Sequence, residues 1–489
     1  MASRALGAVA SGHREVSEAA ALALRDGGNA FDAVIAAGFA ACVAEPMFAS
    51  LGGGGFLLAR EAQGEAVLFD FFVDAPGRGL AAAELEPHFE PIAVRFPASE
   101  QVFNVGRGSV AVPGALRGLL ESHGELGRLP LSVVVAPAVV LARAGVVLNA
   151  HQAYVQELLT PIVTQSAAGR AIYAPGGETR NEGERVVNAD LASFLESLPG
   201  AAEDFYTGAL AALMADDMRS GQGLLGPEDL AAYRVVRRAP FSFPYRGCRV
   251  LTNPPPAVGG ALLARAFEAW AGRPDSGWDS VERRLGLAEV MAQVERERVP
   301  PATGGTTHVS VADGAGNVAS LSLSNGEGSG YVVPGTGIML NNMLGEDDLH
   351  PGGFHVQPPG TRVGSMMAPT LVLEGDSVRL VIGSGGSKRI RGAILQVMTG
   401  VLDAGLSLGA AVEAPRQHWD GEQLQLEPGI APEVVAALGE RWRVNPWNER
   451  NLYFGGVHAV VPGVEAAADP RREGAARVVS GTTAETPGP

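Results

Sequence analysis

The stretch that decides the fold is GGTTHVSV, at residues 304–311. It follows a Pro- and Gly-rich run, and it opens a segment in which apolar and polar residues alternate. A second alternating arm, at 318–324, follows the turn sequence DGAGN at 313–317. Alternation with a period of two on both sides of a tight turn predicts a β-hairpin with one apolar and one polar face. Thr306 is expected to begin this hairpin, directly after an exposed linker.

Helical patterns surround the predicted hairpin on both sides along the chain. Two Ala-rich segments, ending and beginning at the DGGN turn of residues 26–29, predict a pair of helices near the start. Later stretches predict two more strands and three more helices. Strand-rich hairpins between Ala-rich helices favour sheets that are covered by helices on both outer faces. The strands are expected at 370–373 and 378–382, and the helices at 261–270, 281–298 and 390–402.

The composition narrows the classes of function. The chain has 489 residues, 46% of them hydrophobic and 18% charged, which describes a compact globular protein. Its formal net charge of −16 argues against a nucleic acid or an anionic membrane as partner. Two isolated cysteines predict neither a disulfide framework nor a zinc site. The beginning shows no signal-peptide pattern, and the apolar run at 33–44 is too short to span a membrane, so a cytoplasmic location is expected.

Thr306 could carry chemistry because of its position. A threonine hydroxyl is a weak nucleophile unless a base lies beside it, and one available base is the α-amino group of the same residue. That group exists only if the chain is cut between Gly305 and Thr306. The small residues upstream would let the Thr306 hydroxyl reach the Gly305 carbonyl. The alternative is an ordinary threonine at the start of a strand.

Two other clusters have the right chemistry for a site. The turn GSGGS at 383–387 lies between a predicted strand and a helix, where successive backbone N–H groups can form an oxyanion hole. The acidic run at 346–348 could bind a substrate ammonium group. Both also have plain structural interpretations, as a connecting turn and a solvated loop. The spacing of His350 and His355 suits no metal site.

Several ordered motifs carry a family resemblance. They are GGNAFDA at 27–33, EP at 45–46, GGGGF at 52–56, TTHVSV at 306–311, GTGIMLNN at 335–342 and DPRREGAA at 469–476. With these motifs, the chain resembles the γ-glutamyltranspeptidase family over nearly its whole length. The resemblance implies a four-layer αββα fold of the α+β class and a precursor cut into pieces 1–305 and 306–489, which form one interwoven unit. It implies no metal and no organic cofactor.

The resemblance also assigns catalytic roles. It makes Thr306 the nucleophile of an acyl-enzyme mechanism, released by self-cleavage after Gly305. It places Ser324 where a second hydroxyl hydrogen-bonds the nucleophile. The oxyanion hole carries over onto the backbone amides of Gly385 and Gly386.

The half of the site that recognises the substrate departs from the family pattern. Asn325 is the nearest match to an asparagine that contacts the substrate's amino-acid end, and Asp348 is chosen for the α-amino group, with Asp347 and Glu346 close behind. An arginine that binds the α-carboxylate in γ-glutamyl-specific members is replaced by Phe72. Arg78 is near in sequence. Two adjacent serines of the family, which also contact the substrate's α-carboxylate, correspond here to Gly364 and Ser365, so only one hydroxyl remains. Met343 stands where the family often has a glutamine after the Asn-Asn pair.

Three functions therefore compete. The leading hypothesis is a self-cleaving threonine amidase for γ-glutamyl amides such as glutathione, with water or an amine as acceptor. A rival keeps the mechanism but takes another side-chain amide, as cephalosporin- and glutaryl-acylase relatives do, with Phe72 and Met343 making an apolar acyl pocket. A third is an unprocessed relative that only binds a metabolite.

Overall fold

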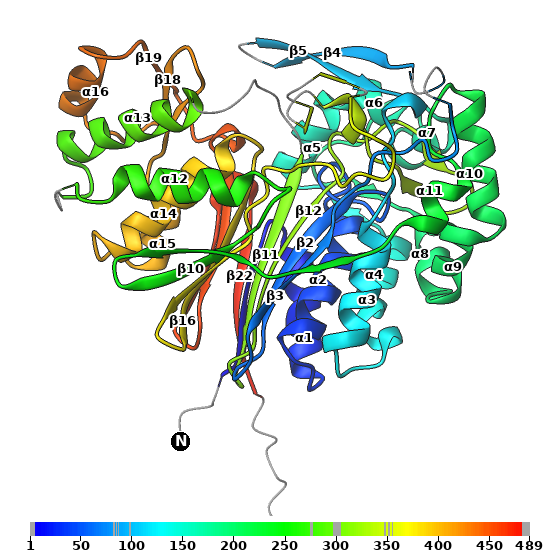
Figure 1. Cartoon of the computed structure of the whole chain (residues 1–489), viewed down its shortest axis with the longest axis horizontal. Coiled ribbons are helices and arrows are strands. Elements are labelled where there is room, and N and C mark those ends of the chain that lie inside the picture. Colours follow the sequence, from blue (N-terminus) through cyan, green and yellow to red (C-terminus); the bar gives the residue numbers. More distant parts are fainter. Residues whose placement is uncertain are drawn as a thin grey trace, which may run out of the picture.

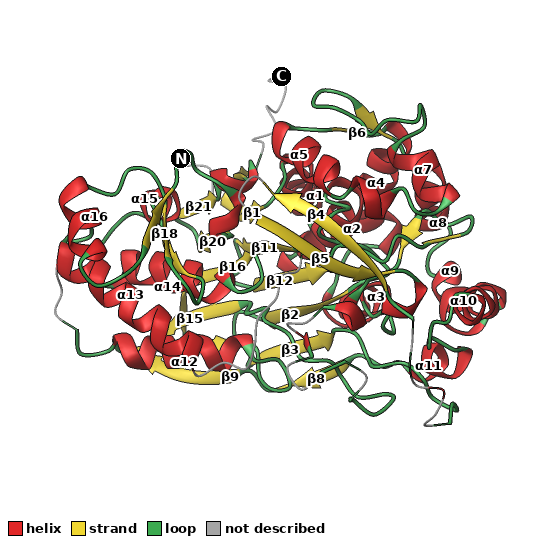
Figure 2. Ribbon diagram, turned by 90° about the horizontal axis from the view of Figure 1, so that it is seen from above, coloured by secondary structure: helices red, strands yellow, loops and turns green. Residues whose placement is uncertain are grey.

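Two antiparallel β-sheets packed face to face form the centre of the molecule, and helices cover both outer sides (Figure 1). The structure is a computed structural model. The α+β sandwich of four αββα layers that the sequence predicts is confirmed, and Figure 2 shows the same layers from above, with strands in the middle and helices on either flank. The structure describes residues 5–81, 84, 86, 88–96, 99–273, 277–296, 305–346, 349–350, 353–354 and 356–481.

The first sheet has seven strands, and the predicted hairpin lies at its centre. The two arms of the hairpin pair in register, with Thr306 opposite Ser324. In order across the sheet, the strands are β22 (Ala475–Ser480), β1 (Ala5–Ser11), β11 (Thr306–Asp313), β12 (Val318–Ser324), β2 (Gly54–Arg60), β3 (Ala66–Phe71) and β8 (Val236–Arg238).

The second sheet has six strands, and it contains the two strands expected after residue 369. Both sheets mix strands from before and after residue 305, so the two parts of the chain are interwoven. In order, the strands are β21 (Glu465–Ala468), β20 (Gly456–Val461), β16 (Ser377–Gly385), β15 (Thr370–Glu374), β10 (Cys248–Thr252) and β9 (Phe241–Tyr245).

Both faces of the central hairpin are buried. Its apolar side chains, among them Val309 and Leu321, belong to the core under the helices of the first layer. Its polar face looks toward the second sheet, where His308 lies against Gly383. Nδ1 of His308 is 2.8 Å from the hydroxyl of Ser322, so the polar groups of this face hydrogen-bond one another between the sheets. Burial there lowers the pKa of His308, which favours a neutral ring.

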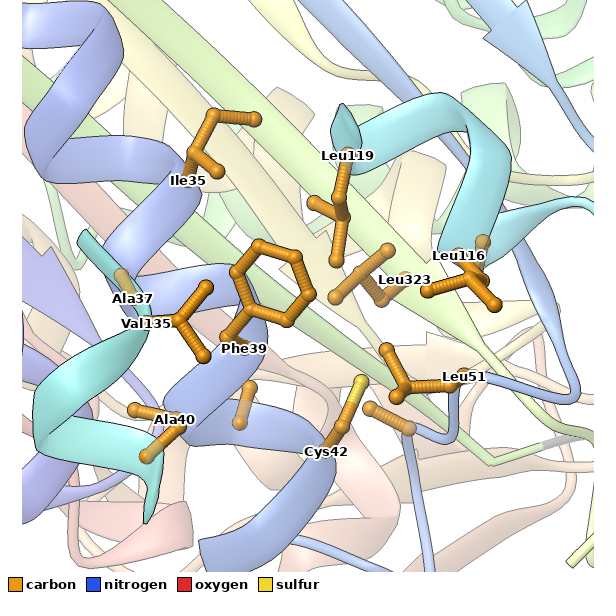
Figure 3. Packing of buried hydrophobic residues seen from close by; sticks show 14 of the residues in the cluster. Ile35, Ala37, Phe39, Ala40, Cys42, Leu51, Leu116, Leu119, Val135 and Leu323 are labelled. Carbon is orange, nitrogen blue, oxygen red and sulfur yellow. The ribbon is translucent and has the colours of Figure 1, made fainter. Parts of the chain in front are cut away.

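Helices α1 (Arg14–Arg25) and α2 (Ala30–Ala44) are joined by the predicted DGGN turn. Asn29 caps the start of α2, because its side chain accepts hydrogen bonds from the N–H groups of Phe31 and Asp32. Every residue of α2 is buried, as expected for a helix that is apolar on all sides apart from Asp32 in its first turn. Figure 3 shows Phe39 of α2 among side chains of β12, α3 (Ala115–Leu126) and α4 (Leu131–Ala144).

The outer layer on the second sheet holds the three later helices that the sequence predicts. These are α12 (Gly259–Trp270), α13 (Val281–Arg296) and α14 (Arg389–Leu402), accompanied by α15 (Leu408–Glu413). The predicted end of the second helix and the linker after it, at 297–304, lie outside the described residues. No helix in the described ranges combines the length and the apolar character needed to cross a membrane.

The remaining elements surround this sandwich. The helices are α5 (Ala150–Leu158), α6 (Thr160–Val163), α7 (Ala167–Tyr173), α8 (Ala189–Glu196), α9 (Gly200–Thr207), α10 (Ala209–Ser220), α11 (Pro227–Ala232) and α16 (Pro432–Gly439). The short strands are β4 (Glu90–Phe96), β5 (Ser99–Val105), β6 (Val146–Val147), β7 (Arg185–Val186), β13 (Val332–Val333), β14 (Ile338–Met339), β17 (Gln417–Trp419), β18 (Leu424–Leu426) and β19 (Val444–Pro446). The 3-10 turns are η2 (Arg107–Ser109), η3 (Met343–Gly345), η5 (Leu452–Phe454) and η6 (Pro470–Arg472).

Candidate active site

Thr306 is the first residue of β11, at the end of the central strand pair, and only 4% of it is exposed. The residue before it must be small, because a Cβ atom on Gly305 would come within 2.6 Å of the Gly326 carbonyl oxygen and 2.8 Å of the Met47 carbonyl oxygen. Glycine therefore lets the chain enter the strand through a narrow passage.

Ser324 stands opposite Thr306 on the neighbouring strand. Its hydroxyl donates a 2.5 Å hydrogen bond to the carbonyl oxygen of Gly305 and accepts one from the N–H of Gly326 at 3.2 Å. A donor on this oxygen polarises the peptide bond between residues 305 and 306, which makes its carbon a better target for a nucleophile.

The predicted glycine turn at 383–387 lies beside Thr306, although the structure extends β16 through Gly385 and places the turn only after it. Gly385 ends β16, and a Cβ atom there would lie only 2.1 Å from the carbonyl oxygen of Thr306, so any side chain at this position would displace Thr306. Gly386 follows with φ +114, and Ser387 adopts φ +51, an unusual conformation for a residue with a side chain. The structure thus brings Thr306, Ser324 and the predicted oxyanion turn together.

A pocket opens next to Thr306. Its walls are mostly apolar, and the side chains at its polar points are hydroxyls and one carboxylate. Ser365, which the sequence predicts as a substrate contact, belongs to it. The lining residues are Phe72, Thr306, Ser324, Met343, Glu346, Leu349, Ser365, Met366, Met367, Ser387 and Ile390.

No cationic side chain lines this pocket among the described residues. Phe72, in the place of the family's arginine, is buried and stacks on Phe56 with ring centroids 5.5 Å apart. Arg78 does not replace that arginine, because its side chain is exposed and its guanidinium lies against Gly360. The side chain of Arg362 is 8% exposed and lies near Phe72, but it is paired with the acidic residues Asp70 and Asp74.

Arg362 belongs to a separate cluster of charges behind Phe72. It forms ion pairs with Asp70 at 2.9 Å and with Asp74 at 2.7 Å, and it donates to the Phe72 carbonyl oxygen. Asp70 also pairs with Arg238 at 2.7 Å. These charges balance one another within the protein, so this arginine supports the wall of the pocket.

The residues predicted to hold the substrate's amino-acid end differ in whether the structure places them at the pocket. Asn325 is 1% exposed, and neither Oδ1 nor Nδ2 of its side chain has a hydrogen-bond partner among the described residues, although it does not line the pocket. Glu346 does line the pocket and is 7% exposed. Asp347 and Asp348, the residue chosen from the sequence, lie outside the described residues.

Glu45 and Arg472 are buried ionisable residues beside Thr307 and Thr306 to which the sequence assigned no role. The Thr307 hydroxyl donates to both carboxylate oxygens of Glu45 at 3.0 Å, and burial raises the pKa of Glu45 to about 7. Nη1 of Arg472 donates to the carbonyl oxygen of Thr306 at 3.2 Å. Both residues lie in motifs that carry the family resemblance, which was the only signal for them.

The described residues offer no metal site, since no three of their His, Cys, Asp or Glu side chains gather closely enough to hold an ion. His350 binds the Met343 carbonyl oxygen through Nε2 at 2.9 Å, and His355 lies outside the described residues.

The fold and the placement of Thr306 define the class. A threonine at the start of a central strand, in a two-sheet sandwich covered by helices, is the arrangement of the N-terminal-nucleophile hydrolases. Among solved structures, the cephalosporin acylase from Bacillus halodurans superposes with a TM-score of 0.81 at 26% identity, covering 97% of this chain and 96% of that one.

The sequence comparisons give the family. The profile described as gamma-glutamyltranspeptidase matches residues 16–298 and 279–479, so the chain belongs to the γ-glutamyltranspeptidase family of enzymes. The Acylase ACY 1 proenzyme of Pseudomonas sp. (strain SE83) is 34% identical over 89% of this chain and 87% of its own length. The glutathione hydrolase proenzyme of Escherichia coli (strain K12) is 29% identical over 88% and 84%.

Proposed function

We propose that this protein is a self-cleaving amidohydrolase whose nucleophile is Thr306. The observation that carries the proposal is the juxtaposition of Thr306 with a polarised Gly305 carbonyl and an adjoining pocket. The names of the Pseudomonas and Escherichia coli relatives above, both proenzymes, support it.

The proposed self-cleavage proceeds through an ester intermediate. The Thr306 hydroxyl adds to the Gly305 carbonyl carbon, and the C–N bond breaks as the nitrogen takes up a proton. An ester then joins Gly305 to the Thr306 oxygen, and water hydrolyses it to leave a carboxylate on Gly305 and a free α-amino group on Thr306.

Turnover uses the same oxygen. The new α-amino group accepts the hydroxyl proton while the oxygen attacks the carbonyl carbon of a substrate amide, and the departing amine receives a proton. The acyl group stays on Thr306 as an ester until water or another amine takes it. Backbone N–H groups of the turn at Gly385 and Gly386 are the proposed donors to the oxyanion.

We further propose that the acyl group is not γ-glutamyl and carries no carboxylate. The pocket lacks a cationic partner among the described residues, and an unpaired buried charge is costly, by at least about 1–3 kcal/mol. An uncharged or amine-bearing acyl group fits the apolar walls and the Glu346 carboxylate. The 34% identity to the Acylase ACY 1 proenzyme, against 29% to the glutathione hydrolase proenzyme, supports an acylase over a glutathione hydrolase.

A denaturing gel tests the cleavage. The wild-type protein is expected to give pieces of about 305 and 184 residues, with Thr306 as the first residue of the smaller one on N-terminal sequencing. Thr306→Ala should give one full-length band, whereas the exposed control Thr207→Ala should cleave normally. A full-length wild-type band would contradict the proposal and favour a non-catalytic binding protein.

A panel of 4-nitroanilides tests the acyl group. Wild-type enzyme should release nitroaniline from uncharged aliphatic or aryl-acyl anilides with a kcat/KM at least roughly tenfold above those for γ-glutamyl and glutaryl anilides, since tenfold corresponds to about 1.4 kcal/mol. Preference for γ-glutamyl would overturn the proposed acyl group but leave the nucleophile in place.

A further inference from the structure

The carbonyl group of Thr306 is held from two sides. Arg472 donates to its oxygen from Nη1 at 3.2 Å, and Gly385 approaches it so closely that no Cβ atom would fit between them. Arg472 is 4% exposed and does not line the substrate pocket. Arg472 therefore contacts the proposed nucleophilic residue Thr306 itself, and not the pocket proposed for the acyl group.

The segment that carries Arg472 is firmly anchored. Arg472 is the last residue of η6, and Asp469 directly precedes that turn. The Asp469 carboxylate pairs with Arg416 at 2.6 Å and with Arg471 at 3.1 Å. The guanidinium of Arg472 also lies 4.6 Å from the centre of the Phe48 ring. Because its backbone and its side chain are both fixed, Arg472 can act as a rigid donor.

The charges that face Arg472 come from several elements. Glu45 and Asp469 attract it, while Arg389 and the rings of His151 and His458 are the neighbouring basic groups. Burial lowers the pKa of Arg472 to about 10, so the guanidinium is still charged at neutral pH. Burial also lowers the pKa of both histidines to about 3, which leaves Arg472 as the nearby cation that hydrogen-bonds Thr306.

We propose that Arg472 is a positioning residue for the nucleophile: it holds the Thr306 carbonyl in place after cleavage and, by its fixed positive charge, favours the neutral form of the Thr306 α-amino group. The inference rests on the proposed function, because that amino group is created by the cleavage.

Two physical effects support this role. A new chain terminus tends to fray, and a charge-assisted hydrogen bond to its first carbonyl opposes that motion. Covalent geometry keeps the nitrogen and the carbonyl oxygen of one residue within about 3–4 Å. The guanidinium therefore lies close enough to the amine to disfavour its protonation, and only the unprotonated amine can accept the hydroxyl proton.

The test measures kcat and KM against pH for cleaved wild type, Arg472→Gln, Arg472→Lys and the control Arg477→Gln, whose side chain is 36% exposed. Arg472→Gln is expected to lower kcat by roughly 10–100-fold with little change in KM. The acidic limb of its profile should move up by about one pH unit, because the amine then protonates more easily. Arg472→Lys should keep the limb near its wild-type position.

A double variant separates positioning from charge balance. Glu45→Gln combined with Arg472→Gln leaves neither of these two charges buried, and it serves in place of the single variant if that one does not fold. If Arg472 only neutralises Glu45, the double variant regains wild-type kcat, and the inference is overturned. If Arg472 positions Thr306, kcat stays low. An Arg472→Gln profile that falls equally at every pH without moving its acidic limb would also overturn it.

The two proposals fail in different ways. Absence of cleavage in wild-type protein counts against Thr306 as the nucleophile. Normal cleavage and turnover in wild type, together with unchanged kcat and pH profile in the Arg472 variants, counts against the positioning role alone.

Discussion

The Ser324 hydroxyl lies 2.5 Å from the carbonyl oxygen of Gly305, on the strand position directly opposite Thr306. The hairpin register thus delivers a hydrogen-bond donor to the bond that is proposed to break. A hairpin shifted by one residue would turn that hydroxyl to the other face of the sheet.

Ser324→Ala should slow self-cleavage strongly, because the developing oxyanion on Gly305 loses a preorganised donor. Loss of one such donor costs roughly 10²–10³-fold in rate. The measurement is the time course of band conversion after purification of the precursor. The exposed Ser480→Ala is the control, and conversion of Ser324→Ala at the wild-type rate would refute the assigned role.

Phe72→Arg should shift the acyl preference toward γ-glutamyl and glutaryl anilides. A guanidinium at this wall supplies the missing partner for a carboxylate, and bonds of this type contribute about 1.5–3 kcal/mol, or roughly 10–150-fold in the ratio of kcat/KM values. Phe72→Leu separates size from charge, since it should not raise that ratio. If both variants raise it equally, pocket volume rather than charge controls the preference.

Glu45 makes stability depend on pH. Its folded pKa of about 7 lies above its ordinary value of 4.5, so the folded state binds the proton more tightly, and this stabilising contribution is lost as pH rises through that window. Glu45→Gln should therefore gain free energy of unfolding relative to wild type between about pH 5 and pH 8, by on the order of 2–3 kcal/mol. Denaturant melts at both pH values measure it. Glu125→Gln, at a side chain 37% exposed, should show no such gain, and parallel pH curves for wild type and Glu45→Gln would contradict the assignment.

Arg362→Gln should destabilise the fold without redirecting specificity. It would leave two buried carboxylates, Asp70 and Asp74, without one of their partners, and breaking a buried pair costs about 3–5 kcal/mol. Thermal unfolding should show the loss, with Arg379→Gln, whose side chain is 46% exposed, close to wild type. A change in the γ-glutamyl to uncharged acyl ratio would instead place Arg362 at the substrate.

The features of the fold that could be predicted from the sequence are those set by local patterns. The alternation at 306–324 and the DGGN turn before α2 are properties of neighbouring residues, and both appear in the structure as expected. The replacement of an arginine by Phe72 was inferred from the family resemblance and not from a local pattern. Alternation could not show what covers the polar face of the hairpin, which the structure buries against the second sheet.

The contacts that the sequence missed join distant segments. Arg472 is 166 positions from Thr306, and Glu45 is 262 positions from Thr307. Only packing of the two sheets and α2 brings these charges together, and no spacing along the chain encodes it. Ser387, which also lines the pocket, has a positive φ that no local sequence pattern predicted.

Because both sheets contain strands from before and after residue 305, cleavage would change how the protein unfolds and refolds. If the bond before Thr306 is cut as proposed, the two sheets are built from two separate polypeptides, each of which contributes strands to both sheets. Denaturation then becomes dissociation, and recovery requires two partners to meet again, so its yield depends on concentration. The intact precursor folds as a single chain and needs no such encounter. The stability of the cleaved enzyme is therefore expected to be kinetic: it stays folded because it unfolds slowly, and it does not refold readily once it has unfolded.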